Sequence, residues 1–253
     1  MIQTRVIPCL LLRGNGLVKT KKFKDAIYVG DPVNAVRIFS EKEADEIIIL
    51  DIDASRDGCQ PNYELITEMI SEAFMPVAYG GGVRTLEQIR RLIRSGVEKV
   101  VINTLATEST EIICKAVEVF GSQAIVGAVD VRRKLLGGYA VVSKSATKTT
   151  DLNFKQHIEN LLQAGVGELF INDVSRDGCM TGYDLDLVRE IANVPVPLVI
   201  CGGAGRLEHL REAVHNGGAT AAAAGSLFVF YGKHKAVLIN YPENKEIQKI
   251  FAG

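Results

Sequence analysis

The chain has 253 residues, of which 47% are hydrophobic and 23% are charged, so it is long and apolar enough to bury a large core. Its 29 basic and 30 acidic residues give a formal net charge of −1, which disfavours binding to nucleic acid or to an anionic membrane surface. Five cysteines without a Cys-x-x-Cys pair predict neither a disulfide framework nor a metal site, and we expect a cytoplasmic protein without a cofactor.

Predicted strands and helices alternate along the chain. Each strand is a short, continuously apolar run, and each helix has apolar residues along one face. The helix with the clearest boundaries begins with a capping box, Thr85-x-x-Gln88, and stops at Gly96. In chain order we expect strand 5–11, helix 31–42, strand 46–50, helix 62–72, strand 76–79, helix 85–95, strand 99–102, helix 110–120, strand 124–129, helix 153–164, strand 168–171, helix 184–192, strand 196–200, helix 205–216 and strand 219–223.

This alternation predicts the fold class. Strands that alternate with helices form parallel sheets, and continuously apolar strands are buried on both faces. Eight such units in about 250 residues match a closed (β/α)8 TIM barrel, with an open doubly wound sheet as the alternative. The first apolar run, residues 6–12, is short and contains Pro8, which favours a strand over a signal peptide or a membrane span.

An internal repeat divides the chain into two similar halves. The sequence SRDGC occurs at Ser55 to Cys59 and again at Ser175 to Cys179, 120 positions later. The segments 76–82 and 197–203 are also alike, and both end in glycines. A repeat of four strand-helix units predicts one barrel domain, residues 1–253, made of two half-barrels at about 1–122 and 123–253. Matching loops of the two halves would then lie on opposite sides of the barrel axis.

Each half contains a glycine-rich turn between a strand and a helix, a geometry that presents backbone N–H groups to an anion. We call Gly82, Asn103 and Thr104 the first cup, and Gly203, Gly225 and Ser226 the second cup. The simpler interpretation is that the glycines only turn the chain. Their duplication favours a ligand with two phosphates, one in each half.

Carboxylates at strand ends are candidates for acid-base chemistry. Asp51, Asp57 and Asp177 also suit helix capping and loop anchoring, although Asp177 could contact substrate. Asp130 directly follows the apolar run 124–129, so we expect it at the catalytic end of the barrel. The four histidines lie away from strand ends, which predicts surface or packing roles.

Charged residues also stand at four strand starts, at the opposite end of the predicted barrel. Arg5, Glu46, Lys99 and Glu168 each precede an apolar run. The start of a strand often meets solvent, and this alone would explain a charged residue at each of the four positions. Together, two cations and two anions could pair around the lower mouth of the barrel and gate whatever passes through it.

Several stretches resemble the cyclase subunit of imidazole glycerol phosphate synthase, the HisF type, over essentially the whole chain. They are VIPCLL, GDPVNAV, AYGGGVRT, VINT, FGSQAIV, SRDG-x-x-x-GYDL, CGGAG and AGSLF. The resemblance implies a (β/α)8 barrel that receives ammonia from a HisH-like glutaminase at its lower face and uses it on a phosphorylated small molecule at its upper face. It also implies that the two cups bind phosphate, that Lys19 contacts substrate from a mobile first loop, that Asp130 is catalytic, and that Arg5, Glu46, Lys99 and Glu168 form the ammonia gate.

The chain departs from the family at one catalytic position. The family has a second aspartate in a Cys-Leu-Asp motif, whereas this chain has Leu11 there. The segment CLLLRGNGLVKTKKF instead resembles a HisF-like branch linked to acetamidino groups on the sugars of bacterial surface polysaccharides. That branch implies a glutaminase and a sugar amidotransferase as partners. A cyclase of histidine biosynthesis and a non-catalytic ammonia-conducting adaptor are the alternatives.

Overall fold

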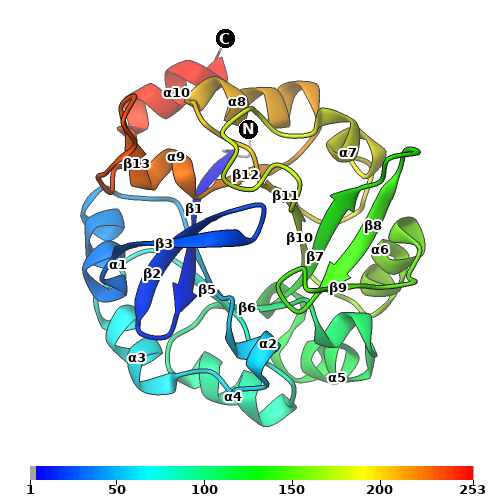
Figure 1. The fold of residues 1–253 in the computed structure, drawn as a ribbon. Helices are drawn as coiled ribbons and strands as arrows, with labels where there is room; N and C mark the ends of the chain where they lie inside the picture. The colour runs from blue at the N-terminus through cyan, green and yellow to red at the C-terminus, as the bar shows by residue number, and fades with distance from the viewer. Residues whose placement is uncertain (1–3, 253) are drawn as a thin grey trace.

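A computed structural model describes residues 4–252 of the chain. Within these residues, eight parallel strands form a closed barrel, because the last strand pairs with the first (Figure 1). The closure confirms the predicted TIM barrel over the open sheet. In their order around the barrel the strands are β1 (Arg5–Arg13), β4 (Ile47–Asp51), β5 (Val77–Gly80), β6 (Lys99–Ile102), β7 (Ile125–Arg133), β10 (Glu168–Asp173), β11 (Leu198–Cys201) and β12 (Ala221–Ala224).

Helices surround the barrel on its outer side (Figure 1). The predicted helices are all present, as α1 (Pro32–Glu41), α3 (Tyr63–Ser71), α4 (Leu86–Arg94), α5 (Glu111–Phe120), α6 (Phe154–Gln163), α7 (Leu185–Glu190) and α8 (Leu207–Arg211). The capping box of α4 is formed, since the Gln88 backbone N–H donates to Thr85 Oγ1 at 3.2 Å and the Thr85 N–H donates to Gln88 Oε1 at 3.0 Å.

The helix predicted over 205–216 is not regular along its whole length. The α-helix ends at Arg211, and residues Glu212–Asn216 continue as a π-helical turn. The Ala219 N–H donates to Ala213 O at 3.1 Å and the Gly217 N–H to Glu212 O at 3.0 Å, which gives the chain a wider turn before β12. A run of apolar residues with helical spacing does not distinguish these two kinds of turn.

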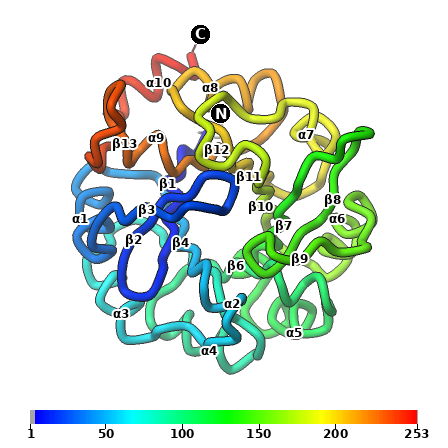
Figure 2. The backbone as a smooth tube through the Cα atoms, viewed as in Figure 1, coloured from blue at the N-terminus to red at the C-terminus, as the bar shows by residue number. Residues whose placement is uncertain are grey.

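The structure also contains elements that the sequence did not predict. Two barrel strands extend past the rim and turn back as antiparallel hairpins: β1 pairs with β2 (Gly16–Lys21), and β7 pairs with β8 (Tyr139–Ser143). The strand β2 continues into β3 (Lys24–Gly30), and this hairpin crosses the barrel mouth (Figures 1 and 2). The smaller additions are α2 (Ala54–Asp57), β9 (Lys148–Thr149), α9 (Ser226–Val229), β13 (Phe230–Tyr231), β14 (Ala236–Val237) and α10 (Asn244–Ala252).

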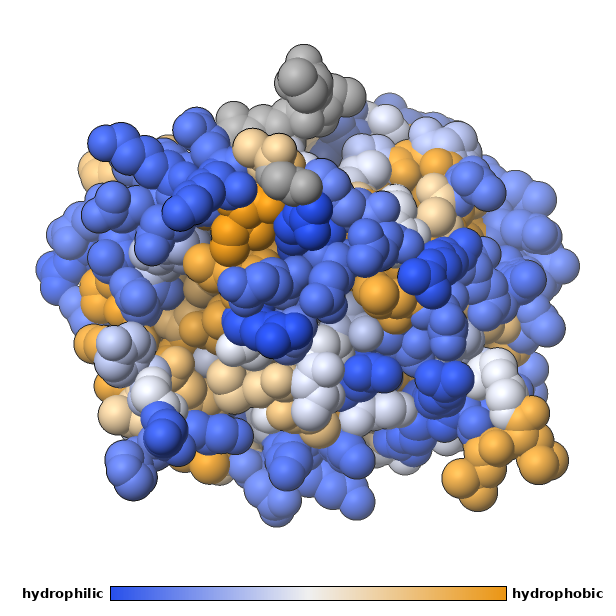
Figure 3. Space-filling view, turned by 90° about the horizontal axis from the view of Figure 1, so that it is seen from above, coloured by the Kyte–Doolittle hydropathy of each residue, from blue (hydrophilic) through white to orange (hydrophobic). Residues whose placement is uncertain are grey.

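The buried side chains form two clusters. A large cluster fills the space between the barrel and its helices, and a smaller one fills the barrel interior. The interior cluster is entirely apolar apart from two thiols, and its members are Ile7, Cys9, Ile48, Ala78, Val101, Val126, Ala128, Phe170, Val199, Cys201, Ala221 and Ala223. By contrast, hydrophilic residues dominate the outer surface seen in Figure 3. Among residues 4–252, no helix has the length and apolar character needed to cross a membrane.

Candidate functional site

Asp130 lies on β7, where the barrel interior meets the upper clefts. Only 8% of its surface is exposed. Its two carboxylate oxygens accept hydrogen bonds from Asn103 Nδ2 at 2.7 Å, directly after β6, and from Asn172 Nδ2 at 3.2 Å, on β10. Burial raises the pKa of Asp130 to about 7, although the two amide donors partly oppose this effect. A carboxyl group with this pKa can give or take a proton at neutral pH.

The first cup forms one end of a cleft of about 680 Å³ that also contains Asp130. Gly82 has a φ of +68°, and a Cβ there would lie 2.5 Å from the carbonyl oxygen of Cys59. Glycine is therefore required for the chain to pass this close to the SRDGC loop. Asn103 and Thr104 line the same cleft, so the structure brings together all three residues of this cup.

The second cup lines a smaller cleft of about 380 Å³, together with Lys19 and Asp177. The predicted residues Gly203, Gly225 and Ser226 all face this cleft. Lys19 lies within β2, where the resemblance implied a loop, and its ammonium group donates to the Cys9 carbonyl oxygen at 2.7 Å. The hairpin thus delivers a cation into the second cup, as an anion site requires.

Asp177 anchors the hairpin that crosses the barrel mouth. Its carboxylate accepts from Thr20 Oγ1 at 2.7 Å and from the Phe23 backbone N–H at 3.2 Å. Its carbonyl oxygen accepts from the Lys22 N–H at 2.9 Å. Burial raises the pKa of Asp177, while the hydrogen bond from Thr20 and the charge of Lys19 oppose the shift. The anchoring role considered for Asp177 therefore has a direct structural basis.

Leu11 faces the upper clefts, at the position where the resemblance implies a second aspartate. Its side chain is 6% exposed and lines both the cleft of the first cup and that of the second. A leucine cannot transfer a proton, so this position adds only an apolar wall. Asp130 remains as the carboxyl group held between the two asparagines.

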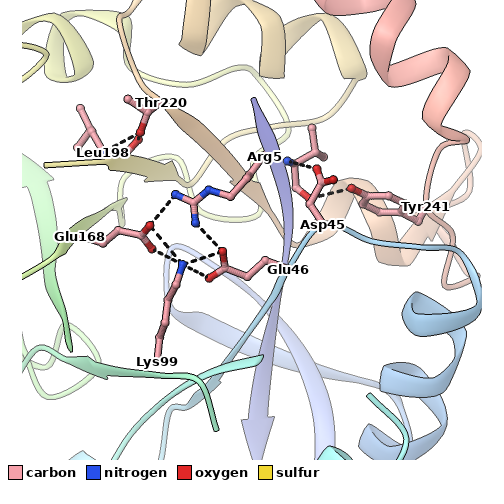
Figure 4. Close-up of polar contacts among 9 residues, drawn as sticks. Arg5, Asp45, Glu46, Lys99, Glu168, Leu198, Thr220 and Tyr241 are labelled. Carbon is pink, nitrogen blue, oxygen red and sulfur yellow. Dashed lines mark hydrogen bonds and ion pairs between the residues drawn. The ribbon is translucent and has the colours of Figure 1, made fainter. Parts of the chain in front are cut away.

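The four charged strand-start residues form a closed ring at the lower end of the barrel (Figure 4). Arg5 contacts Glu46 and Glu168 at 2.5 Å each. Lys99 Nζ lies 2.8 Å from Glu46 and 3.3 Å from Glu168. Glu46 is 2% exposed and Glu168 5%, so contact with solvent does not explain them. Two cations and two anions neutralise one another across the barrel axis.

Comparison with known proteins agrees with this geometry. A family model described as "Histidine biosynthesis protein" matches residues 5–235. The chain belongs to this family, as a HisF-type member. It is 52% identical over 96% of its length to a Pseudomonas aeruginosa protein named "Putative imidazole glycerol phosphate synthase subunit hisF2", of which 97% is covered. Two further relatives have similar names. A Vibrio vulnificus protein is 47% identical over 98% of this chain and 96% of its own length. A Leptospira interrogans protein is 44% identical over 99% of this chain and 100% of its own length.

One residue of this HisF-type site was missed by the sequence analysis. Asn172 follows the apolar run 168–171 just as Asp130 follows 124–129, so the same signal was present. It was overlooked because only carboxylates were considered as acid-base groups at strand ends, and the other polar residues were considered only as members of the two cups. The histidines lie elsewhere: His157 is buried in α6, and His209 Nδ1 accepts from the Gly205 N–H at 3.1 Å. Within residues 4–252, no three His, Cys, Asp or Glu side chains cluster as metal ligands would.

The second cup provides a first test of the HisF-type site. A Cβ at position 225 would overlap with the Lys19 ammonium group and lie 2.9 Å from the Cys9 carbonyl oxygen. We expect Gly225→Ala to displace Lys19 and to weaken binding of inorganic phosphate at this cup by about tenfold or more, since a charge-assisted hydrogen bond is lost. Calorimetric titration with phosphate should show two sites in the unchanged protein and one strong site in the variant.

Gln163→Ala is the control, because Gln163 is exposed at the end of the outer helix α6, away from both cups. It should bind phosphate as the unchanged protein does. Two strong sites in Gly225→Ala, or two empty cups in crystals soaked in phosphate, would contradict the assignment of the cups as anion sites.

Proposed function

We propose that this HisF-type chain takes up ammonia from a HisH-like glutaminase and conducts it through the barrel to an acceptor bound at the upper clefts. The observation that carries the proposal is the arrangement along the barrel axis. A neutral ring of charges lies at the lower end, an apolar interior follows, and a titratable carboxyl group lies between the two glycine-containing cups at the upper end.

The apolar interior suits ammonia as the transported molecule. Ammonia is small and neutral, so it enters an apolar core at a much lower cost than an ion does. The closed ring would have to open for passage, by loss of at least one of its four ion pairs. Lys99 is bonded only through its single ammonium group and its side chain is 15% exposed, so we expect it to move when a glutaminase docks over the ring.

Leu11 indicates what happens to the ammonia. Ring closure by a cyclase needs one group to accept a proton and another to donate one. The upper clefts have Asp130 for this chemistry and Leu11 where the family has its second carboxylate. This favours formation of an acetamidino group on a sugar for surface polysaccharide, with a sugar amidotransferase as the second partner. The alternative is the cyclase of histidine biosynthesis, which the relatives' names and the two cups favour.

The two functions differ in a measurable way. Supplied with ammonia and the bisphosphate precursor of imidazole glycerol phosphate, the purified chain should show negligible turnover, and Leu11→Asp should restore a trace of it. Co-expression with a cognate glutaminase should still give a complex that hydrolyses glutamine. Cyclase turnover on the order of one per second would overturn the acetamidino proposal in favour of the cyclase. Failure to bind any cognate glutaminase would overturn the transport proposal itself.

A further inference from the structure

The barrel interior contains two thiols in an otherwise apolar lining. Cys9 of β1 and Cys201 of β11 belong to the interior cluster, whose other members are aliphatic residues and one phenylalanine. Both are free cysteines, and they are only 3% and 7% exposed. Their side chains lie within hydrogen-bonding reach of each other. No local sequence pattern links the two residues, because only closure of the barrel brings β1 and β11 together.

The strand between the two cysteines leaves room for this contact. Figure 1 shows β12 between β1 and β11, in agreement with the strand order. The inward-facing residues of β12 are alanines, and Gly225 directly follows the strand. A Cβ at position 225 would lie 2.9 Å from the Cys9 carbonyl oxygen. Since β12 presents no larger side chain here, the two thiols can approach each other across it.

The spacing of the strands does not allow a disulfide between the two cysteines. Neighbouring strands lie about 4.8 Å apart, so β12 keeps the Cα atoms of Cys9 and Cys201 roughly 8–10 Å apart. A disulfide needs Cα atoms about 4.4–6.8 Å apart. The two sulfur atoms therefore face each other without being able to bond directly, a geometry that suits one shared atom between them.

The surroundings of the two thiols provide a countercharge but no further ligand. Lys19 lines the same cleft, and its ammonium group donates to the Cys9 carbonyl oxygen at 2.7 Å. The Asp177 carboxylate also lines this cleft, but it already accepts from Thr20 Oγ1 and the Phe23 N–H. Within residues 4–252, no third His, Cys, Asp or Glu joins the two thiols in a metal-binding cluster. A metal ion held here would have two sulfur ligands and a cation nearby.

Two sulfur ligands and one nearby cation favour a particular metal ion. Structural zinc in proteins takes four ligands, and magnesium and calcium take oxygen ligands. Copper(I) prefers soft thiolate ligands and is stable with only two of them. Two thiolates and one copper(I) ion together carry a single negative charge, which the Lys19 ammonium group offsets. The complex can therefore be buried without leaving an uncompensated charge.

We propose that Cys9 and Cys201 form a two-coordinate site for copper(I) beneath the second cup. The ion enters through the cleft of about 380 Å³ that both cysteines line. Each thiol releases its proton to solvent as its sulfur bonds to the ion, and no electron is transferred. The bound ion would occupy the end of the interior that opens to the second cup. The site is independent of the proposed function, because it needs neither a glutaminase nor ammonia.

The test is a titration of the full chain with copper(I), under reducing conditions without oxygen and in competition with a chromophoric copper(I) chelator. We expect each chain to withdraw one copper ion from the chelator and to gain the ultraviolet absorption of copper–thiolate bonds. X-ray absorption of the complex should show two sulfur neighbours and no nitrogen or oxygen neighbour. Absence of uptake, or a copper ion with nitrogen or oxygen neighbours, would overturn the proposal.

Variants distinguish the interior pair from the three remaining cysteines, which are more exposed. The triple variant Cys59→Ser, Cys114→Ser and Cys179→Ser is the control and should take up copper as the unchanged protein does. Loss of an outer-shell partner already weakens metal binding by about 10–100-fold, so loss of a sulfur ligand in Cys201→Ser should weaken it by about a hundredfold or more.

Two results with these variants would contradict the site. Copper uptake that is lost in the triple variant, or retained in Cys201→Ser, would place the ion on the outer cysteines. If Cys201→Ser does not fold, the number of sulfur neighbours of copper in the triple variant decides the question, because only Cys9 and Cys201 remain there. None of these measurements involves a glutaminase or turnover, so their outcome leaves the proposed function unchanged.

Discussion

Lys99→Ala should lower the free energy of unfolding by about 3–5 kcal/mol, because it breaks a buried network of ion pairs. Without Lys99, both Glu46 and Glu168 depend on Arg5 alone. Their side chains are only 3% and 7% exposed, so water cannot replace the lost cation. Urea denaturation of the purified chain measures this loss. In a glutaminase complex, the same variant should also alter the rate of glutamine hydrolysis.

The control for this prediction removes one charge of each sign. In the double variant Lys99→Met with Glu46→Gln, Arg5 still pairs with Glu168 and the ring remains neutral. We expect most of the lost stability to return, since no unpaired carboxylate is left. If Lys99→Ala unfolds within about 1 kcal/mol of the unchanged protein, the ring does not have the energetic role that its burial indicates.

Asp130→Asn should stabilise the chain at neutral and alkaline pH while it removes the proposed acid-base group. The ordinary pKa of an aspartate, 3.8, is raised to about 7 by burial at this position. Between these two values the folded state holds a proton that the unfolded state has released, so the unchanged protein loses stability as the pH rises from 3.8 to about 7. An asparagine does not titrate, so the variant does not lose stability over this pH range. Above about pH 7 its free energy of unfolding should exceed that of the unchanged protein by about 2–4 kcal/mol.

The replacement should also keep its hydrogen bonds. The new amide can accept from Asn103 Nδ2 and, once the side-chain amide of Asn172 turns over by half a turn, donate to the oxygen of Asn172. Urea denaturation at about pH 5 and about pH 8 measures the effect, which should be larger at the higher pH. The exposed Asp151→Asn is the matched control and should show no such difference. Equal stabilities of Asp130→Asn and the unchanged protein at both pH values would contradict a raised pKa for Asp130.

The barrel strands were predictable because each is buried on both faces and therefore forms a continuous apolar run. The hairpins at the barrel mouth were not predicted. The β1–β2 turn, Gly14-Asn15, and the β7–β8 turn, which contains Gly137-Gly138, do carry hairpin signals that were overlooked.

The next two turns carry no such signal. The β2–β3 turn places Lys22 and Phe23 at φ values of 55° and 61°, and the β8–β9 turn places Lys144 and Ser145 at 51° and 54°. Neither turn has the Asn-Gly or Asp-Gly pair by which hairpins are usually recognised. Tertiary contacts such as those of Asp177 hold the β2–β3 turn instead.

The positions of Asp130 and of the four ring residues followed from their places at strand ends, but their partners did not. The sequence places Lys99 and Glu168 at strand starts, and only the closed barrel brings the two charges within 3.3 Å of each other. Likewise, the contact of Lys19 with the Cys9 carbonyl oxygen depends on how β2 folds back over β1. Such contacts are set by strand register and barrel closure, which no local pattern of residues specifies.

The order in which the chain is synthesised has a consequence for how the barrel closes. One edge of β1 pairs with β12, and the Val6 carbonyl oxygen accepts from the Tyr241 hydroxyl at 2.8 Å, across 235 positions of sequence. At ordinary rates of translation these late segments follow β1 by roughly ten seconds or more. Until then β1 has an unpaired edge that can pair with another chain. The nascent protein therefore exposes this edge to pairing with other chains until its last strand leaves the ribosome, and faster translation shortens that exposure.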